Sequence, residues 1–416
     1  MIGLGKLALL GSAISSFVSA RSIIFQGTDN SNHNYSRYIV TLRDGLDASA
    51  VEQHIQRAAG IHARSSSPVV EMGRRWNIGS WNAYSCTMDG DTFTQISSDD
   101  AVELIEDNST ISLMKHTVQT DAPWGLADLS HRIANHTDYV YDSNAGEGTY
   151  AYILDTGLLT THEEFEDRAY LGYNAVGGIF ADDVGHGTHV SGVIAGKTYG
   201  VAKKAKVVSV KIFANTRSYT SDLLEGIHWA VRNITAENRQ STSVINISAG
   251  GDTRESVNRA VEEAYKQGVL TIVAAGNYNK DARNYSPASA PSAVTVGSIG
   301  RDHTRSSFSD WGELVDIFSP GEDITSAWIR TNQDTISLDG TSMATPHVSG
   351  LILYLKSVIP YRMKTPGDSI NVLRELATDG VVGDPKGSKN LLAFNGNGVV
   401  IFTGDLTKSP ANVDGM

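Results

Sequence analysis

The chain has 416 residues, of which 40% are hydrophobic and 19% are charged, so it is long enough for two or three domains with at least one sizeable core. This is not the composition of a disordered protein. Lysine and arginine together number 34, aspartate and glutamate 46, and the resulting net charge of −12 would repel phosphate backbones. We therefore expect no nucleic-acid partner.

The N-terminus carries a short apolar segment. Lys6 precedes an apolar run from Leu7 to Val18, and Val18-Ser19-Ala20 offers small residues at a cleavage position. These features predict a signal peptide over residues 1–20, cut after Ala20. The alternative is an N-terminal anchor helix, although the run is short for crossing a bilayer. No later stretch is apolar for long enough to span a membrane, so we expect a secreted, extracellular protein, with the vacuole as the alternative destination.

The cysteine content and the N-glycosylation sequons are also relevant to a secreted protein. The only cysteine, Cys86, cannot form a disulfide within the chain, and no histidine lies nearby in sequence to activate it as a nucleophile. Six N-x-[ST] sequons occur, at Asn34, Asn108, Asn135, Asn233, Asn246 and Asn284. Asn246 lies within an apolar, strand-like run and is expected to be inaccessible, which leaves the other five as expected glycosylation sites.

Residues 37–119 are predicted to form a small α+β unit. The expected elements are a strand at Arg37–Leu42, a helix opened by a Ser49–Glu52 capping box, strands at Pro68–Ile78 and Trp81–Met88, a second short helix containing Val102 and Leu104-Ile105 and capped by Asp99 or Asp100, and a last strand at Ile111–Met114. This βαββαβ order is that of the ferredoxin-like split βαβ arrangement, which by itself names no function.

The pattern changes from Thr149 onward. Apolar runs with few alternating polar positions occur at Tyr150–Leu154, Val207–Phe213, Val244–Ile247 and Val269–Ala275, and helical stretches occur at Asp222–Asn233 and Arg254–Gln267. Such runs suit strands buried on both faces of a sheet, so we predict a doubly wound, mostly parallel α/β domain. Apolar periodicity lapses over about residues 115–121. We place the domain boundary there, with a first domain at 21–119 (its folded part about 37–118) and a second at 120–416.

Asp155 directly follows the first of these runs, in Leu154-Asp155-Thr156-Gly157. In open α/β sheets, functional sites gather at the carboxyl ends of strands. A buried carboxylate at that place can hold an imidazole in one tautomer and stabilise its protonated form. The triplet alone is ambiguous. Aspartic proteases need two copies of Asp-Thr-Gly, and this chain has one, while a structural cap or turn remains the other interpretation.

His186 lies in Gly185–Gly192, where a helix is predicted. A neutral imidazole can act as general base for a hydroxyl nucleophile when a third group orients it. His186 and His189 are three residues apart, so a metal site is the alternative, but the chain has no H-E-x-x-H motif. We expect His189 to be a packed structural histidine.

Ser342 opens an apolar helix that is predicted to run to about Ser357. A helix N-terminus offers free N–H groups where negative charge develops on a substrate oxygen. A simple N-cap serine is the alternative, whereas an esterase elbow would require a G-x-S-x-G motif that does not surround Ser342. Asn277, which ends another strand-like run, can donate a second hydrogen bond to such an oxyanion.

The order Asp…His…Ser, with this local sequence around each residue, resembles the subtilisin superfamily, and within it the proteinase K-like fungal branch. The resemblance extends from about Arg37 to Ala393. It includes Asp121–Leu126, which is similar to a mature start of that branch, and Asp281–Ser289.

This resemblance implies that Asp155, His186 and Ser342 form a catalytic triad with Asn277 as the oxyanion donor. It implies a substrate cleft formed by Ser248, Ala249, Gly250, Ala275 and Gly276 on one side and by Ser218 and Tyr219 on the other, where an extended peptide pairs by β-augmentation. It also implies a structural calcium site made by the carbonyls of Pro291 and Ala293 and the carboxylate of Asp316.

Three departures from the branch stand out. Ala249 replaces a usual leucine, so the outer subsites are expected to be roomier. Val190 stands where many relatives have a free cysteine, and the disulfide cysteines of proteinase K are absent.

We therefore expect a secreted serine endopeptidase with a broad, apolar preference, because the implied cleft segments contain no acidic residue. It is expected to be a monomer that is made as a self-processing zymogen, with the 21–119 domain as its own inhibitor and no cofactor for the chemistry. A catalytically dead binding protein on the same scaffold is the alternative, although such a protein need not keep all four catalytic residues.

Overall fold

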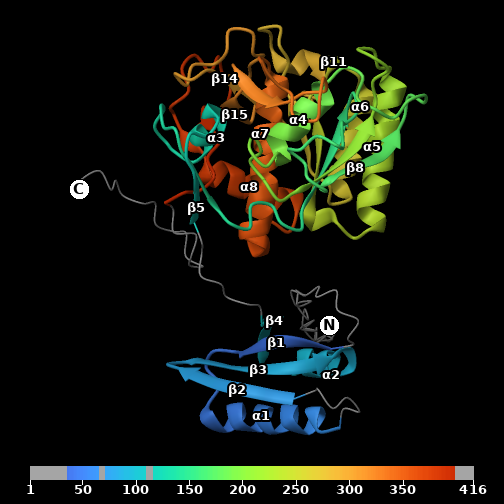
Figure 1. Ribbon diagram of the computed structural model, residues 1–416. Helices are drawn as coiled ribbons and strands as arrows, with labels where there is room; N and C mark the ends of the chain where they lie inside the picture. The colour runs from blue at the N-terminus through green and yellow to red at the C-terminus, as the bar shows by residue number, and fades with distance from the viewer. Residues whose placement is uncertain (1–34, 65–70, 109–115, 399–416) are drawn as a thin grey trace, which may run out of the picture. The chain divides into compact units, whose positions relative to one another are not determined.

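The computed structural model describes residues 35–64, 71–108 and 116–398, which form two compact units divided between Leu113 and Met114 (Figure 1). The first unit is a four-stranded sheet with two helices. Its elements are β1 (Tyr35–Leu42), α1 (Ala48–His62), β2 (Glu71–Ile78), β3 (Trp81–Asp89), α2 (Gly90–Ser97) and β4 (Val102–Asp107). The antiparallel strand order β2-β3-β1-β4 is the split βαβ arrangement, so the predicted element order is confirmed.

Two predicted elements of this unit are wrong in position. The segment around Val102 and Leu104-Ile105, predicted as a helix, is instead strand β4, which pairs antiparallel with β1; Val102 and Ile105 are both buried, and the pairing has a register shift between Thr41 and Leu42. The second helix lies upstream, where Asp89 caps it by accepting a hydrogen bond from the N–H of Thr92. Its glycine, threonines and serine are weak helix formers, which hid it from the sequence. The strand predicted at Ile111–Met114 lies outside the described residues.

The first helix of this unit begins slightly earlier than predicted. Asp47 is its N-cap and accepts from the N–H of Ala50 at 2.8 Å, so Ser49 lies inside the helix and does not cap it. Cys86 lies in the core, and burial raises the pKa of its thiol to about 12.

The second unit is built around a nine-stranded sheet with the order β18-β19-β15-β14-β12-β10-β7-β9-β8. Its sheet strands are β7 (Tyr150–Asp155), β8 (Ala169–Asn174), β9 (Lys206–Lys211), β10 (Ser243–Ile247), β12 (Thr271–Ala274), β14 (Val294–Ile299), β15 (Ile317–Pro320), β18 (Thr378–Asp379) and β19 (Leu391–Leu392). Every neighbouring pair is parallel except β18–β19. The predicted doubly wound, mostly parallel α/β class is confirmed.

Helices cover both faces of this sheet (Figure 1). They are α3 (Trp124–Leu129), α4 (His186–Ala195), α5 (Thr220–Ala236), α6 (Glu255–Lys266), α7 (Thr341–Val358) and α8 (Pro366–Leu376), with three short 3₁₀ turns at Gln240–Thr242, Ala282–Asn284 and Pro360–Arg362. Ala151 and Ile153 of β7 belong to the core with α4 and α7, while Tyr152 and Leu154 belong to the core with α5 and α6. Burial on both faces explains why these strands are continuous apolar runs in the sequence.

Short antiparallel pairs lie outside the main sheet. They are β5 (His116–Gln119) with β6 (Tyr139–Asp142), β11 (Gly251–Asp252) with β13 (Tyr285–Ser286), and β16 (Ile324–Ala327) with β17 (Thr335–Leu338). The first of these bears on the domain boundary. The sequence analysis assigns residues up to 119 to the first domain, but Thr117, Val118 and Gln119 pair with Tyr141, Val140 and Tyr139, respectively, of the second unit.

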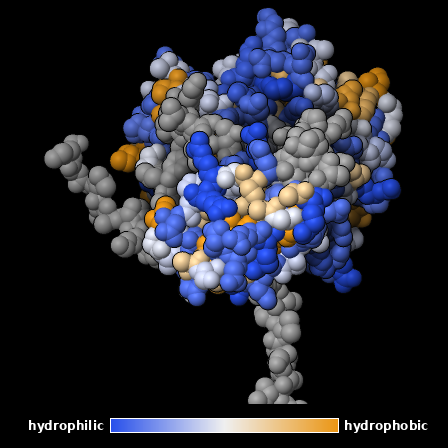
Figure 2. Space-filling view, turned by 90° about the horizontal axis from the view of Figure 1, so that it is seen from below, coloured by the Kyte–Doolittle hydropathy of each residue, from blue (hydrophilic) through white to orange (hydrophobic). Residues whose placement is uncertain are grey.

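The surface seen in Figure 2 is mostly hydrophilic, with hydrophobic residues in small separate groups. Across the described residues, no helix combines the length and the apolar character needed to cross a membrane.

Candidate active site

The carboxyl end of β7 carries Asp155, whose side chain is buried. His186 is the first residue of α4, and its Nδ1 lies 2.8 Å from Oδ1 and 2.9 Å from Oδ2 of Asp155. A carboxylate only accepts, so Nδ1 carries the hydrogen and Nε2 of the neutral ring is left as the basic nitrogen. Gly185 precedes the helix with a φ of 101°, in the left-handed region, and a side chain there would collide with the ring of Trp328.

The charge of Asp155 sets the basicity of His186. Burial by itself would lower the pKa of His186, but the charge and the hydrogen bond of Asp155 raise it, and the charge of Asp182 adds to them. The net effect is a pKa above the ordinary value of a histidine. An imidazole of this kind accepts a proton readily and holds it as a stabilised cation, as a general base must.

Asp182 links the segments that carry Asp155 and His186. Its Oδ1 accepts hydrogen bonds from Thr156 Oγ1 and from the N–H groups of Val184 and Gly185, and its Oδ2 accepts from the N–H and the hydroxyl of Thr188. Thr156 Oγ1 in turn accepts from Gly187 N–H. The sequence analysis missed Asp182, although its spacing from His186 in Asp-x-x-Gly-His was a signal that could have identified it.

Ser342 lies in the first turn of α7, which packs against the strands in the middle of the sheet. Its hydroxyl donates to the carbonyl of Ser248 at 3.0 Å, and the hydroxyl of Ser248 donates back to the carbonyl of Ser342 at 3.0 Å. This reciprocal pair holds the start of α7 against the segment that follows β10. The hydroxyl hydrogen of a serine rotates about the Cβ–Oγ bond, so the proton of Ser342 can be redirected when a substrate binds.

Asn277 follows β12 and has its amide oriented by Thr341. Oδ1 of Asn277 accepts from the N–H of Thr341 at 2.8 Å and from its hydroxyl at 2.8 Å, which leaves Nδ2 as the free end of the amide. A Cβ placed on Gly340 would lie 3.4 Å from Asn277 Nδ2 and 3.6 Å from the backbone N of Ser342. The two donors therefore lie on one side of Gly340, as donors to a common oxyanion must.

A cavity of about 210 Å³ opens beside these donors. Ser342, Thr341 and Asn277 line it together with Ala249, Gly250, Ala274, Ala275, Gly276, Tyr278, Tyr285, Ser286 and Ala288. Tyr278 and Tyr285 stack with their ring centroids 5.0 Å apart. Gly276 has a φ of 116°, and a side chain there would collide with Oδ2 of the buried Asp310. The wall of the cavity is therefore bare backbone at that point.

The structure brings together most of the predicted cleft residues. Ala249, Gly250, Ala275 and Gly276 line the cavity, and Ser248 bonds Ser342. Ser218 and Tyr219 are not among its lining residues. They lie just before α5, and Tyr219 is 78% exposed. No role was predicted for Tyr278 or Tyr285 from the sequence. The one available signal was that Tyr285 lies within Asp281–Ser289, a segment that resembles the family.

Two further histidines, His189 in α4 and His347 in α7, lie within hydrogen-bond distance of backbone carbonyls. Nε2 of His189 lies 2.9 Å from the carbonyl of Ile324, and burial lowers the pKa of His189 to about 4. His347 Nδ1 bonds the carbonyl of Met343, and burial lowers its pKa to about 4 as well. Both rings are therefore neutral packing groups, and His189 does not present its Nε2 to a metal.

The residues expected to bind calcium are not arranged for it. Oδ1 of Asp316 accepts from the guanidinium of Arg374 at 3.0 Å and from the ammonium of Lys389, and Oδ2 accepts from the N–H of Thr295 at 3.1 Å. A carboxylate already paired with two cations has little negative potential left, and the two cations would repel a divalent ion. The donors present do not fit calcium. These contacts place Asp316 in an ion-pair cluster and argue against the calcium ion expected at Pro291, Ala293 and Asp316, a prediction that chelation experiments decide.

The sequons differ in exposure. Asn108, Asn135 and Asn284 are exposed, while Asn233 is half-buried in α5 and accepts a hydrogen bond from the Tyr152 hydroxyl at 2.6 Å. Asn246 is fully buried in β10. Asn34 lies outside the described residues.

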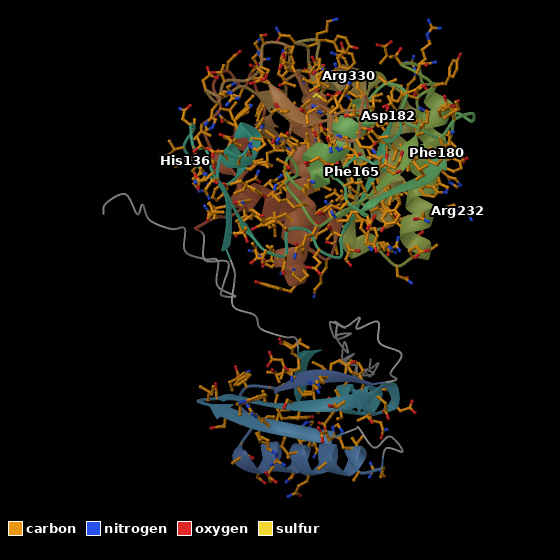
Figure 3. The ribbon with its side chains drawn as sticks, viewed as in Figure 1. His136, Phe165, Phe180, Asp182, Arg232 and Arg330 are labelled. Carbon is orange, nitrogen blue, oxygen red and sulfur yellow. The ribbon has the colours of Figure 1, made fainter. Side chains whose placement is uncertain are left out.

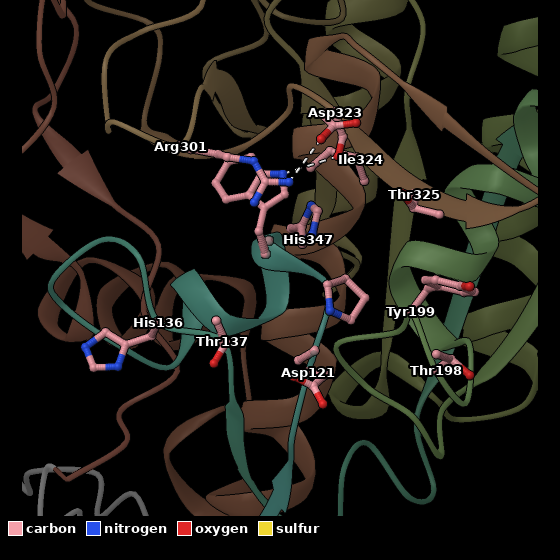
Figure 4. A pocket seen from close by; sticks show the side chains of 14 residues that line it. Asp121, His136, Thr137, Thr198, Tyr199, Arg301, Asp323, Ile324, Thr325 and His347 are labelled. Carbon is pink, nitrogen blue, oxygen red and sulfur yellow. Dashed lines mark hydrogen bonds and ion pairs between the residues drawn. The ribbon is translucent and has the colours of Figure 1, made fainter.

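Figure 4 shows a larger cavity, of about 400 Å³. It is lined by Asp121–Gly125 and by the Arg301–Asp323 ion pair, whose charged atoms lie 3.0 Å apart. The guanidinium of Arg301 lies over the ring of Trp124, 5.1 Å from its centroid. Among its lining residues none is a member of the Asp155–His186–Ser342 set.

Comparison with known proteins decides the family. Residues 146–398, more than half of the chain, match the Subtilase family, and residues 37–114 match the Peptidase inhibitor I9 family. The chain belongs to the subtilase family. Both the expected family and the expected serine endopeptidase activity are confirmed.

The relatives of this subtilase cover most of its length. It is 48% identical over 369 residues to "Alkaline protease 1" of Aspergillus flavus, a match that covers 87% of this chain and 91% of the relative. It is 44% identical over 415 residues to "Alkaline proteinase" of Hapsidospora chrysogena, covering 96% and 100%. Among solved structures, a cold adapted subtilisin-like serine proteinase is 38% identical with a TM-score of 0.61, covering 66% of this chain and 99% of that one.

Proposed function

We propose that this subtilase cleaves peptide bonds by acyl transfer to Ser342. His186 takes the hydroxyl proton of Ser342 and then gives it to the leaving amine, while Asp155 holds the imidazole and stabilises its protonated form. The negative oxygen of the tetrahedral intermediate would be bound by Asn277 Nδ2 and the N–H of Ser342. The observation that carries this proposal is the placement of these two donors on one side of Gly340, at the mouth of the cavity that Ser342 lines.

The cavity supports a broad, apolar preference for the residue before the cut bond. Its lining consists of alanines, glycines, hydroxyl residues, one amide and two tyrosine rings, and no acidic side chain is among the described residues that form it. An unpaired lysine or arginine side chain would therefore have no carboxylate partner there, and desolvating it would be costly. Substrates would be unfolded or loop segments of proteins, bound as an extended strand along the cleft.

We further propose that the chain is a secreted, glycosylated zymogen that cuts itself ahead of β5. A cut after Gln119 would separate β5 from the unit that contains its partner β6, whereas a cut near His116 keeps the pairs of Thr117, Val118 and Gln119. The I9-type unit would then act as the inhibitor of its own peptidase unit. The apolar segment of residues 1–20 supports entry to the secretory route, and the exposed Asn108, Asn135 and Asn284 are the best-placed glycan acceptors.

One variant tests the central step. Ser342→Ala removes the hydroxyl and should leave the fold nearly unchanged, since it loses one hydrogen bond, from the Ser342 hydroxyl to the Ser248 carbonyl, worth about 0.5–1.5 kcal/mol. In a host lacking other subtilases, we expect this variant to accumulate uncut and to resist labelling by a fluorophosphonate. Ser357→Ala, near the other end of α7, is the matched control and should be both cut and labelled. A Ser342→Ala chain that is still divided within residues 115–121, as measured by intact mass, would show that another protease makes the cut.

A further inference from the structure

A second group of polar side chains lies in the loop between α3 and β6, outside the catalytic centre. His131, His136 and Asp138 are close enough for one nitrogen or oxygen atom from each to lie within 4.8 Å of the others. In the described part of the chain, it is the one group of three histidine, cysteine or acidic residues that meets this criterion. Figure 3 shows His136 at the surface of the peptidase unit, well separated from Asp182 beside the catalytic histidine.

The spacing of the three atoms suits a bound ion better than a direct contact. Nε2 of His131 lies 3.7 Å from Oδ1 of Asp138, and Nδ1 of His136 lies 4.0 Å from the same oxygen. These separations are too long for hydrogen bonds. With zinc–ligand bonds of about 2.0–2.1 Å, two ligands of a tetrahedral ion lie about 3.3 Å apart. The two distances to Asp138 therefore exceed the ligand separation of a tetrahedral zinc ion by about 0.4 and about 0.7 Å.

The ring of His131 is already held in the tautomer that a metal requires. Its Nδ1 lies 2.9 Å from the carbonyl oxygen of Ala127 at the end of α3. A carbonyl only accepts, so Nδ1 carries the hydrogen and Nε2, the nitrogen that faces Asp138, has a free lone pair. Metal-binding histidines commonly donate their other ring N–H to a backbone carbonyl in this way.

His136 is the adjustable member of the group. Its ring stacks on that of His131 with a centroid distance of 3.7 Å and an interplanar angle of 6°. Imidazole nitrogens bind metals in the plane of the ring, so two parallel rings cannot both point at one ion and His136 must turn out of the stack. Its side chain is 43% exposed, which leaves room for that rotation.

Within the described parts of the chain, no lysine or arginine pairs with the carboxylate of Asp138. The ion pairs of Asp138 in the described residues are those with the two histidines. The nearby Arg132 points its guanidinium elsewhere, toward the carbonyls of Leu376 and Ala377 and the hydroxyl of Thr378. This contrasts with Asp316, whose carboxylate is paired with two cations.

We propose that His131 Nε2, His136 Nδ1 and Asp138 form a binding site for a divalent transition-metal ion, with Zn²⁺ as the ion tested. Two imidazoles and one carboxylate are ligands that zinc accepts, and water would complete the tetrahedron. The ion would fasten the loop between the end of α3 and the start of β6, the strand that pairs with β5 at the beginning of the peptidase unit. It would take no part in the chemistry at Ser342.

Calorimetric titration with ZnCl₂ tests the site, using the full chain with Ser342→Ala to prevent self-digestion and a purification tag without histidine. We expect one ion per chain and a melting temperature that rises with zinc concentration, because the ion binds only the folded state. His136→Gln keeps the Asn135 sequon and should weaken binding by at least the roughly 10–100-fold that loss of a supporting second-shell partner typically costs. His228→Gln, an exposed histidine of α5, is the matched control and should bind zinc like the parent.

Two results would overturn the proposal. One is zinc binding of equal affinity and stoichiometry in the parent and in His136→Gln, which would place the ion elsewhere, for example at the catalytic histidine. The other is no saturable binding by the parent chain, which would leave the group as a histidine stack beside an aspartate. Asp138→Asn provides a second variant that removes a ligand without touching either ring, and it should weaken binding as His136→Gln does.

Discussion

Asn277 has its two amide atoms committed to different tasks. Oδ1 is held by the N–H and hydroxyl of Thr341, and Nδ2 lies, like the backbone N of Ser342, close to the Cβ position of Gly340. Orientation of the donor before the substrate arrives is what makes such a group effective, because no reorganisation is needed when charge develops.

Replacement of Asn277 should separate these two tasks. Asn277→Ala is expected to lower kcat by about 10²–10³-fold with little change in KM, since the donor acts mainly in the transition state. Asn277→Asp keeps the acceptor for Thr341 but loses the donor, and it should be at least as impaired. Steady-state kinetics on a peptide substrate decide the matter. A KM effect without a kcat effect in both variants would assign Asn277 to substrate binding instead.

The charge of Asp182 should be visible in the pH dependence of activity. Asp182 helps to raise the pKa of His186, and a protonated His186 cannot act as a base, so activity is lost as pH falls through that pKa. Asp182→Asn removes the charge. The acid limb of the kcat/KM profile is therefore expected to move to lower pH, and kcat should fall because the network around Thr156 is loosened.

Asp183→Asn is the control for this profile. Asp183 pairs with Lys211 and is not among the charges that shift the pKa of His186. Its acid limb should stay where it is in the parent enzyme. Equal shifts in the two variants would mean that general surface charge, and not the position of Asp182, sets the profile.

At the scale of elements, the cluster at Asp316 joins parts that are distant in the chain. Asp316 directly precedes β15, and its carboxylate accepts a hydrogen bond from the N–H of Thr295 near the start of β14. Arg374 belongs to α8, and Lys389 lies just before β19. The two cations pair with the carboxylate that the sequence led us to expect as a ligand of a divalent ion, so its charge is balanced within the chain.

Chelation should therefore leave the stability of this subtilase unchanged. For the Ser342→Ala chain prepared free of zinc, which EGTA also chelates, we expect the same melting temperature with and without excess EGTA. Lys389→Met should lower the unfolding free energy by no more than about 1 kcal/mol, because the two cationic side chains are about two-fifths exposed. A double change, Arg374→Met with Lys389→Met, frees the carboxylate and is expected to make the melting temperature respond to calcium. A drop on chelation that disappears in Asp316→Ala would restore the calcium site.

Over the whole molecule, buried lysines make stability depend on pH. Lys203 is 9% exposed, donates to the carbonyl of Thr198 at 3.0 Å and lies over the rings of Tyr139 and Tyr141. Burial lowers its pKa to about 7, against an ordinary value of 10.5. Between these values the unfolded chain holds the proton and the folded chain does not, so the contribution of Lys203 to the unfolding free energy rises with pH by up to about 1.4 kcal/mol per unit.

Lys203→Met should remove that dependence. In the Ser342→Ala background, the variant is expected to be more stable than the parent near pH 7, with a difference that shrinks as the pH approaches 10. Lys204→Met changes a half-exposed neighbour that pairs with Glu147 and should behave like the parent. Urea unfolding measured across this range provides the comparison. A constant difference between Lys203→Met and the parent would mean that packing, and not the proton, is responsible.

The sequence by itself determined the two-unit organisation, the fold class and the family. These depend on local patterns, since continuous apolar runs predict strands buried on both faces, and the motifs around Asp155, His186 and Ser342 are contiguous. Prediction of secondary structure from the sequence failed where weak local preferences compete. Gly90–Ser97 is a helix of poor helix formers, and Val102–Asp107 is a strand whose short apolar pattern also fits a helix.

Only the tertiary structure decided which charges meet. Asp316, an expected metal ligand, is contacted by residues 58 and 73 positions away in sequence and lies in an ion-pair cluster with them. β5 joined the second unit because its partner β6 lies there. The loop between α3 and β6 brought together His131, His136 and Asp138, whose residue types suggested nothing in the linear sequence. Electrostatic partners act through space and have no period along the chain, so a sequence pattern cannot reveal them before the chain is folded.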